Sequence, residues 1–173
     1  MTNNEIWRSV ENVLNGGSLM NKWIVRGLKL AEEASTWSKD RSKIGACLMR
    51  PDHKIASYGY NGLPPGLDDE EILKDRELKN KIIIHAEENA ILNCSDPSLE
   101  NYSLFVYGLN PCNHCASVIA SKGIKYVYAV ATVDSPQWYK TLDITIMVFE
   151  KLGIEFNSYT KQYYEEMKEK FSG

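Results

Sequence analysis

The sequence predicts an α/β protein, a three-layer α/β/α sandwich around a central five-stranded mixed sheet. Five short runs, KIGACLM, KIASYGY, SLFVYGL, KYVYAVA and GIEFN, are predicted strands. In the second half of the chain they alternate with helical segments, which favours parallel pairing there. The first two runs are joined only by the turn RPDH, which predicts an antiparallel hairpin. The chain has 173 residues, of which 43% are hydrophobic, enough for one domain with its own core.

The first half of the chain is predicted to contain two helices and the hairpin. Apolar residues recur at helical spacing in residues 5–14, and the NGG that follows would end this helix. We therefore divide the chain into an N-terminal helical arm, residues 1–18, and a domain, residues 19–173. A longer amphipathic helix is expected to run to about Trp37. The predicted strands of the hairpin are residues 43–49 and 54–60.

The second half begins with a loop and then alternates between strands and helices. The stretch NGLPPGLDDEE carries two prolines and two inner glycines, which interrupt regular structure, and a helical stretch to about Asn80 follows it. The remaining elements are expected to be strands at 103–109, 125–131 and 153–157, and helices at 141–152 and 160–171. In such a sheet, ligands are expected at the carboxyl ends of the parallel strands.

Composition and charge exclude several classes of function. The net charge is −3 and the sequence pI is about 5.7, so an acidic chain without a basic stripe is not expected to bind polymer nucleic acid. A small anion needs only a few local donors and stays compatible. There is no run of eighteen apolar residues to span a membrane, and the N-terminus does not resemble a signal peptide. We therefore expect a cytoplasmic protein, in the host cytoplasm if the protein is viral.

Two cysteines and a histidine point to a metal site. In a reducing compartment a C-x-x-C pair more often binds metal or carries redox chemistry than forms a structural disulfide. Cys112 and Cys115 are three residues apart, so on the first turn of a helix they share one face, where the helix N-terminus favours thiolates. Together with the neutral imidazole of His85, two thiolates would balance Zn²⁺ and leave one tetrahedral position open, as in catalytic zinc sites.

Glu87 lies two residues after His85 and is useful to such a site if it stays off the metal. Zinc lowers the pKa of an adjacent water to roughly 7, and a nearby carboxylate can take that proton and pass it to a substrate. The combination of H-x-E with a downstream P-C-x-x-C matches the signature of zinc nucleobase deaminases. A closed structural zinc site is the alternative, with Glu87, His114 or Cys94 as the fourth ligand. His114 is expected to point to the surface, and Cys47 and Cys94 to be small core residues.

Four stretches resemble the deoxycytidylate (dCMP) deaminases, a branch of the cytidine deaminase superfamily. They are SKDRSKIGACL (38–48), YGYNGLPPGLDD (58–69), HAEENAILN (85–93) and NPCNHCASVIASKGIKYV (110–127). Together they extend over about residues 20–157. The zinc motif is common to the superfamily, whereas GYNG-x-P-x-G-x-DD is the narrower signal for the dCMP branch. The resemblance implies a cytidine-deaminase-like fold.

The same resemblance implies a reaction, cofactors and partners. The reaction is hydrolysis of dCMP to dUMP and ammonia, which supplies dUMP for dTTP synthesis. The implied ligands of one Zn²⁺ per chain are His85, Cys112 and Cys115, with Glu87 as the proton shuttle. Asn61 is implied to hold the sugar, and the backbone of Ala86 to read the cytosine edge. Homohexamers activated by dCTP and inhibited by dTTP with Mg²⁺ are common in the family, and the effector site is associated with Gly59, Tyr60, Asn61 and Gly62.

Other residues have a functional and a structural interpretation. Ser38 and Lys39 could donate to a 5′-phosphate or belong to a solvated loop. Asn61 before Gly62 could be turn chemistry. Tyr139, like its neighbour Trp138, could contact the base or the phosphate or pack at an interface. The acidic residues 68–71 could hold Mg²⁺ near an effector, although capping of a helix is the favoured interpretation.

The sequence departs from the family pattern in two places, and two other functions stay open. His114 and Ser117 stand where the family has Glu and Lys, and residues 132–143 match poorly. The chain could be a zinc deaminase of another free nucleoside, nucleotide or RNA base. It could also be a non-enzymatic, zinc-stabilised binding module, for which Glu87 would be dispensable.

Overall fold

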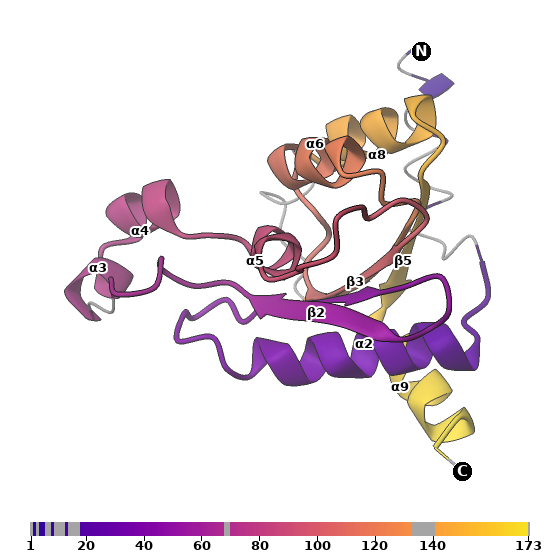
Figure 1. The fold of residues 1–173 in the computed structure, drawn as a ribbon, viewed down its shortest axis with the longest axis horizontal. Coiled ribbons are helices and arrows are strands. Elements are labelled where there is room, and N and C mark those ends of the chain that lie inside the picture. Colours follow the sequence, from indigo (N-terminus) through magenta and orange to yellow (C-terminus); the bar gives the residue numbers. More distant parts are fainter. Residues whose placement is uncertain are drawn as a thin grey trace.

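The computed structural model describes residues 2, 4–5, 8, 13, 18–67, 70–132 and 141–172. A five-stranded sheet with the order β2-β1-β3-β4-β5 forms its centre (Figure 1). β1 pairs antiparallel with both β2 and β3, whereas β3, β4 and β5 are parallel, so the mixed sheet is confirmed. The strands are β1 (Gly45–Met49), β2 (Ile55–Tyr60), β3 (Ser103–Gly108), β4 (Tyr126–Ala131) and β5 (Glu155–Thr160).

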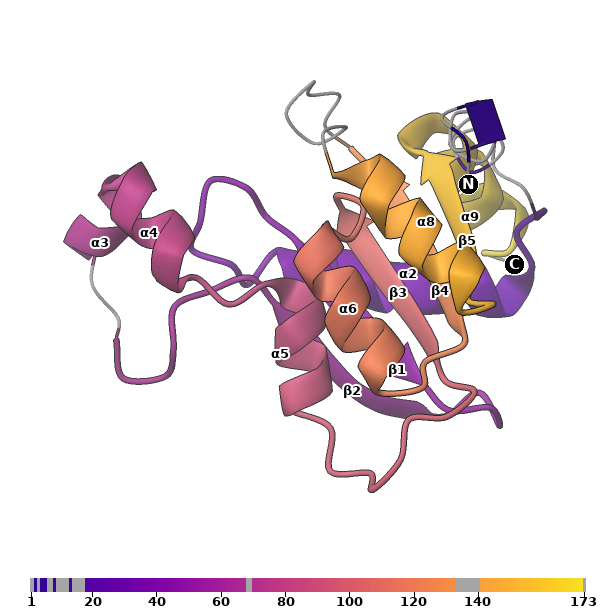
Figure 2. The same cartoon turned by 90° about the horizontal axis from the view of Figure 1, so that it is seen from above.

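Helices cover both faces of the sheet, which confirms the three-layer sandwich (Figures 1 and 2). One face carries α2 (Lys22–Ser35) and α9 (Lys161–Lys170), and the other carries α5 (Ala86–Leu92), α6 (Asn113–Ser121) and α8 (Leu142–Lys151). Side chains of β3 alternate between the two cores: Leu104 and Val106 pack with α5, α6 and α8, and Phe105 packs with α2. Because helices cover both faces, the three inner strands β1, β3 and β4 are nearly continuous apolar runs.

Local signals explain where the helices begin. The side chain of Asn21 accepts hydrogen bonds from the backbone N–H groups of Trp23 and Ile24, at 2.9 and 3.1 Å, so α2 starts at Lys22. The hydroxyl of Thr160 accepts from the N–H of Tyr163 at 3.2 Å and begins α9 in the same way. No helix in the described ranges combines the length and the apolar character needed to cross a membrane.

The structure corrects two predicted elements and leaves a third outside the described residues. The helical stretch predicted up to Asn80 is two short helices, α3 (Glu70–Lys74) and α4 (Arg76–Ile82), because Asp75 caps a new helix through the N–H of Leu78 at 3.0 Å. The fifth strand is β5 and not residues 153–157, since Gly153 has a φ of 65° and forms a turn. The helix predicted over residues 5–14 lies mostly outside the described residues, so the N-terminal arm stays a prediction.

We expect Gly59→Ala to destabilise the fold by about 1–3 kcal/mol, the usual cost of overpacking. A Cβ atom at Gly59 would lie 2.4 Å from the backbone nitrogen of Ala90 and 2.7 Å from the carbonyl oxygen of Ala86, and backbone atoms cannot rotate away. Gly62→Ala is the matched control, because its nearest neighbour would be a ring carbon of Tyr60 at 3.8 Å. Urea unfolding measures both, and equal midpoints for the two variants would contradict the prediction.

Candidate active site

Two helix starts bring the predicted metal ligands together on one face of the sheet. His85 is the N-cap residue of α5, and Cys112 is the N-cap residue of α6 with Cys115 in its first turn. The segment before α6 follows the carboxyl end of β3, where the topology predicts ligand chemistry. α5 and α6 lie next to each other in both views (Figures 1 and 2). The two sequence motifs, 27 residues apart, therefore form one site.

The geometry of these three side chains suits zinc. The Nδ1 atom of His85 lies 3.3 Å from the Sγ atom of Cys115 and 3.6 Å from that of Cys112. Nitrogen and sulfur atoms that share a tetrahedral zinc are about 3.5 Å apart, given metal–ligand bonds of roughly 2.0 and 2.3 Å. In the described ranges, the ligand atoms of His85, Cys112 and Cys115 form a cluster within 4.8 Å, and Glu87, His114 and Cys94 are not part of it. The cluster thus offers three candidate ligands, the number that a catalytic zinc site uses.

The protonation of the two thiols also fits a site for a dication. A hydrogen bond from Cys115 lowers the pKa of Cys112 to about 3, and the same bond, together with burial, raises the pKa of Cys115. The contact with Cys112 raises the pKa of His85 to about 9. Metal binding would therefore release protons from His85 and Cys115, as is usual when thiolate and imidazole ligands take up zinc.

Glu87 lies on the first turn of α5 and is only 4% exposed. Burial raises the pKa of its carboxyl group to about 7, although the nearby charge of His85 acts in the opposite direction. A pKa near the working pH is the property of an efficient general acid and base. The carboxylate is thus placed beside the ligands without belonging to the cluster, as the sequence predicts.

Two polar side chains that the sequence analysis missed hold the segment before Cys112. The hydroxyl of Thr145 on α8 donates to the carbonyl oxygen of Pro111 at 3.0 Å, and the hydroxyl of Ser158 on β5 donates to the Oδ1 atom of Asn110 at 2.7 Å. Both donors are buried. They lie 34 and 48 residues further along the chain than the residues they hold, so no local pattern identifies them.

We expect Thr145→Val to lower the free energy of unfolding by about 1–3 kcal/mol. Valine keeps the shape of threonine but leaves the buried carbonyl oxygen of Pro111 without its donor. Thr36→Val is the control, because Thr36 also donates to a backbone carbonyl oxygen, that of Glu33, but does so at the surface. Chemical unfolding of both variants tests this, and an equal loss in the two would contradict it.

His114 joins the two ligand-bearing helices at the surface. Its Nε2 atom lies 2.8 Å from a carboxylate oxygen of Glu88, and the other oxygen of Glu88 accepts from the N–H of His85 at 3.3 Å. The exposed position agrees with the prediction. Cys47 is buried among the side chains between α2 and the sheet, which confirms it as a core residue. Cys94 is only half-buried and packs against the edge of the opposite core, so the prediction of a core position was wrong for Cys94.

Asn61 and Ser38 are buried and bonded inside the protein. The amide of Asn61 accepts from the N–H of Ile44 at 2.9 Å and donates to the carbonyl oxygen of Ser42 at 2.6 Å. The hydroxyl of Ser38 donates to the carbonyl oxygen of Asn61 at 2.7 Å. In this arrangement both side chains fix the loop that follows α2. Lys39, the next residue, is exposed.

The predicted effector residues lie at the end of β2. Gly59 is explained by close packing of α5, and Gly62 exchanges backbone hydrogen bonds with Ile84, directly before His85. The ring of Tyr60 is partly exposed and contacts the edge of Trp37. Ala86 is fully buried. Tyr139 lies outside the described residues, so its role stays a prediction, and so do the effector roles.

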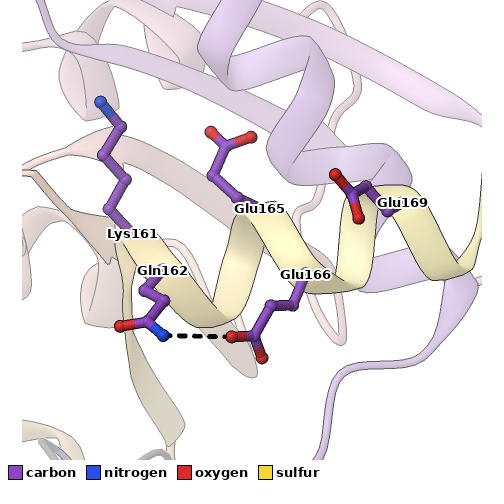
Figure 3. Close-up of a pocket in the computed structure, with 5 residues that line it drawn as sticks. All are labelled: Lys161, Gln162, Glu165, Glu166 and Glu169. Carbon is purple, nitrogen blue, oxygen red and sulfur yellow. Dashed lines mark hydrogen bonds between the residues drawn. The ribbon is translucent and has the colours of Figure 1, made fainter.

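A separate hollow runs along the exposed face of α9 (Figure 3). It is lined by Lys161, Gln162, Glu165, Glu166 and Glu169, and Gln162 donates to Glu166 at 3.2 Å. Since α9 covers the opposite face of the sheet from α5 and α6, this hollow is not part of the candidate site.

Comparison with known proteins agrees with this geometry. Residues 20–131 match the family model of the cytidine and deoxycytidylate deaminase zinc-binding region. The chain is 34% identical to mouse deoxycytidylate deaminase over 135 residues, which is 73% of each chain. It is also 34% identical to the human enzyme of the same name over 131 residues, 70% of this chain and 71% of the human one.

The chain is also similar to a solved structure of a dCMP deaminase. The dCMP deaminase of cyanophage S-TIM5, in complex with dCMP and dUMP, superimposes with a TM-score of 0.62 at 26% identity, covering 82% of this chain and 99% of that one. The family model matches well over half of the sequence, and it includes all three metal ligands and Glu87. The chain therefore belongs to the cytidine and deoxycytidylate deaminase family, and it is a zinc-binding deaminase.

Proposed function

We propose that this protein hydrolyses dCMP to dUMP and ammonia, with zinc as its cofactor. The observation that carries the proposal is the three-ligand cluster of His85, Cys112 and Cys115 with the buried carboxyl group of Glu87 beside it. The choice of dCMP is supported by the relatives, which include mouse and human deoxycytidylate deaminases and a phage structure that holds dCMP and dUMP.

Glu87 carries the proton transfers of the proposed reaction. Zinc, when bound, would act as a Lewis acid and lower the pKa of a water molecule. Glu87 would accept a proton from the water that attacks C4 of the cytosine, and it would deliver that proton to the ring nitrogen. It would then take the second proton of the former water from the hydroxyl group on C4 and give it to the departing amine, which leaves as ammonia. A pKa near 7 allows the carboxyl group to act in both directions.

Substrate contacts are proposed for residues around the site. Asn61 would hold the sugar, the backbone of Ala86 would read the cytosine edge, and the exposed Lys39 would attract the 5′-phosphate. Tyr139 is a further proposed contact. A contact between Ser38 and the phosphate would compete with the hydrogen bond from the Ser38 hydroxyl to the carbonyl oxygen of Asn61.

Regulation and assembly follow from the family resemblance. The proposed enzyme is a cytoplasmic homohexamer that supplies dUMP for dTTP synthesis, is activated by dCTP and is inhibited by dTTP with Mg²⁺. Gly59, Tyr60, Asn61 and Gly62 would form the effector site. A sigmoidal dCMP curve that becomes hyperbolic with dCTP would support this regulation, and a curve unchanged by either nucleotide would remove it.

Ammonia release tests the proposed reaction directly. The zinc-loaded protein is assayed with equal concentrations of dCMP, deoxycytidine and a cytosine-containing oligonucleotide. We expect turnover on dCMP to exceed the other two, because only the free nucleotide presents both the base and an unesterified 5′-phosphate. Preference for deoxycytidine or for the oligonucleotide would retain the deaminase site and overturn the proposed substrate.

A further inference from the structure

We propose that Lys79 is a positioning residue, whose largely buried ion pair with Asp40 latches residues 63–67 and 70–83 against the loop that follows α2. This inference rests on the proposed function for its effect on dCMP, but the latch itself can be measured without substrate. We call the described residues between Gly62 and Ile84, 63–67 and 70–83, the excursion, because they lie away from the sheet between two residues that belong to the body of the domain. These two residues pair with each other, through N–H to carbonyl bonds of 3.1 and 2.9 Å.

The excursion has little apolar contact to hold it. Its helices α3 and α4 stand away from the sheet, and none of their apolar residues is buried (Figures 1 and 2). α3 and α4 contact each other, but in the described part of the chain no Cα atom of either helix lies within 8 Å of one in a third helix or in a strand. Hydrophobic packing, which fixes most helices, is therefore weak here. Polar contacts must determine where the excursion lies.

Lys79 supplies such a contact from α4. Its Nζ atom lies 2.8 Å from the Oδ1 atom of Asp40, and the side chains of Lys79 and Asp40 are only 12% and 6% exposed. Such burial sets this pair apart from the other lysine pair on α4, between Lys81 and Glu77, whose side chains are 67% and 83% exposed. An exposed pair contributes little, whereas removing one partner of a buried pair leaves a charge without compensation.

Asp40 connects this contact to the proposed substrate residues. Its Oδ1 atom also accepts from the N–H of Arg41 at 2.6 Å, and its Oδ2 atom accepts from the amide of Asn61 at 3.3 Å. Its own N–H donates to the hydroxyl of Ser38 at 3.2 Å. One carboxylate thus joins α4, the loop after α2 and the end of β2. Displacement of Lys79 would loosen the residues proposed to hold the sugar and the phosphate.

The metal ligands have supports of their own. His85 is held by the Gly62–Ile84 pair and by the carboxylate of Glu88, and the segment before Cys112 is held by Thr145. Loss of the latch should therefore affect binding of dCMP more than zinc content. We therefore expect KM to rise while kcat stays nearly unchanged, a pattern that a general loss of stability would not produce.

The test compares Lys79→Met with Lys81→Met, which removes a lysine from the same helix but breaks only the exposed pair. For Lys79→Met we expect the KM for dCMP to rise about tenfold, equivalent to about 1.4 kcal/mol of binding free energy. We expect kcat to change less than threefold and zinc to remain at one per chain. A protease that cleaves after glutamate should cut the excursion faster, at the exposed residues Glu70, Glu71 and Glu77. Lys81→Met should match the wild type in all four measurements.

Two further variants separate the latch from stability. Lys79→Arg keeps a cation that can reach Asp40, so its KM for dCMP should lie close to that of the wild type. If Lys79→Met alone fails to fold, Asp40→Asn/Lys79→Met removes both charges and should fold, again with a raised KM and rapid cleavage. If Lys79→Met has the KM and the cleavage rate of the wild type, the proposed latch is wrong. If Lys79→Met does not fold, the same result in the double variant would overturn the latch. Failure of the wild type on dCMP would overturn only the proposed function, and the cleavage rates would then decide the latch.

Discussion

Glu87→Gln is expected to lower turnover of dCMP by about 10²- to 10⁴-fold, the usual contribution of a general acid and base. Glutamine has nearly the same volume as glutamate and fits the buried position, but it cannot take a proton from water or return it to the leaving amine. Because the Glu87 side chain lies outside the ligand cluster, zinc content should stay at one per chain. The measurements are ammonia release and metal analysis of the same preparation.

The matched control is Glu88→Gln. Glu88 is the next residue on α5, but its side chain contacts His114 and the N–H of His85 at the surface of the site. Its loss should cost far less turnover than the loss of the Glu87 carboxyl group. If Glu87→Gln retained near wild-type turnover with zinc present, the assigned proton shuttle would be wrong. The binding-module interpretation, in which Glu87 is dispensable, would then gain support.

Removal of a metal ligand should have the second large effect. Cys115 is fully buried in the first turn of α6, so in Cys115→Ala neither water nor a nearby side chain can easily replace its sulfur. We expect zinc content to fall to near zero after dialysis against a mild chelator, and turnover to disappear with it. Second-sphere changes alone cost 10- to 100-fold in metal affinity, so loss of a direct ligand should exceed that range.

Thermal unfolding gives an independent measurement of the same change. A ligand that binds only the folded state stabilises it by about 2.7 kcal/mol when its free concentration is 100 times Kd. Zinc should therefore raise the Tm of the wild type and leave that of Cys115→Ala unchanged. Cys94→Ala is the control, since Cys94 lies outside the cluster, and its response to zinc should equal that of the wild type. A zinc-dependent Tm in Cys115→Ala would contradict the assigned ligand set.

The chemistry of the site was predictable because it is encoded locally. A histidine two residues before a glutamate, and two cysteines three residues apart after a proline, fix side-chain directions as soon as each segment starts a helix. The burial that sets the pKa of Glu87 was not predictable in this way. It depends on how α5 packs against β1 and β2, which places the first turn of α5 beneath the sheet edge and away from water.

The sequence by itself predicted the fold class, the grouping of His85 with Cys112 and Cys115, and the buried position of Cys47. The fold class follows from the alternation of strands and helices, and the grouping follows from two short motifs that match the zinc deaminase signature. Only the tertiary structure decided what supports them. Thr145 and Ser158 reach the cysteine segment from later elements, and Lys79 meets Asp40 across 39 residues of sequence. Asn61, which the sequence places in a turn or against a sugar, is bonded to Ile44, Ser42 and Asp40. Such contacts form only when distant elements pack together, and no local pattern carries that information.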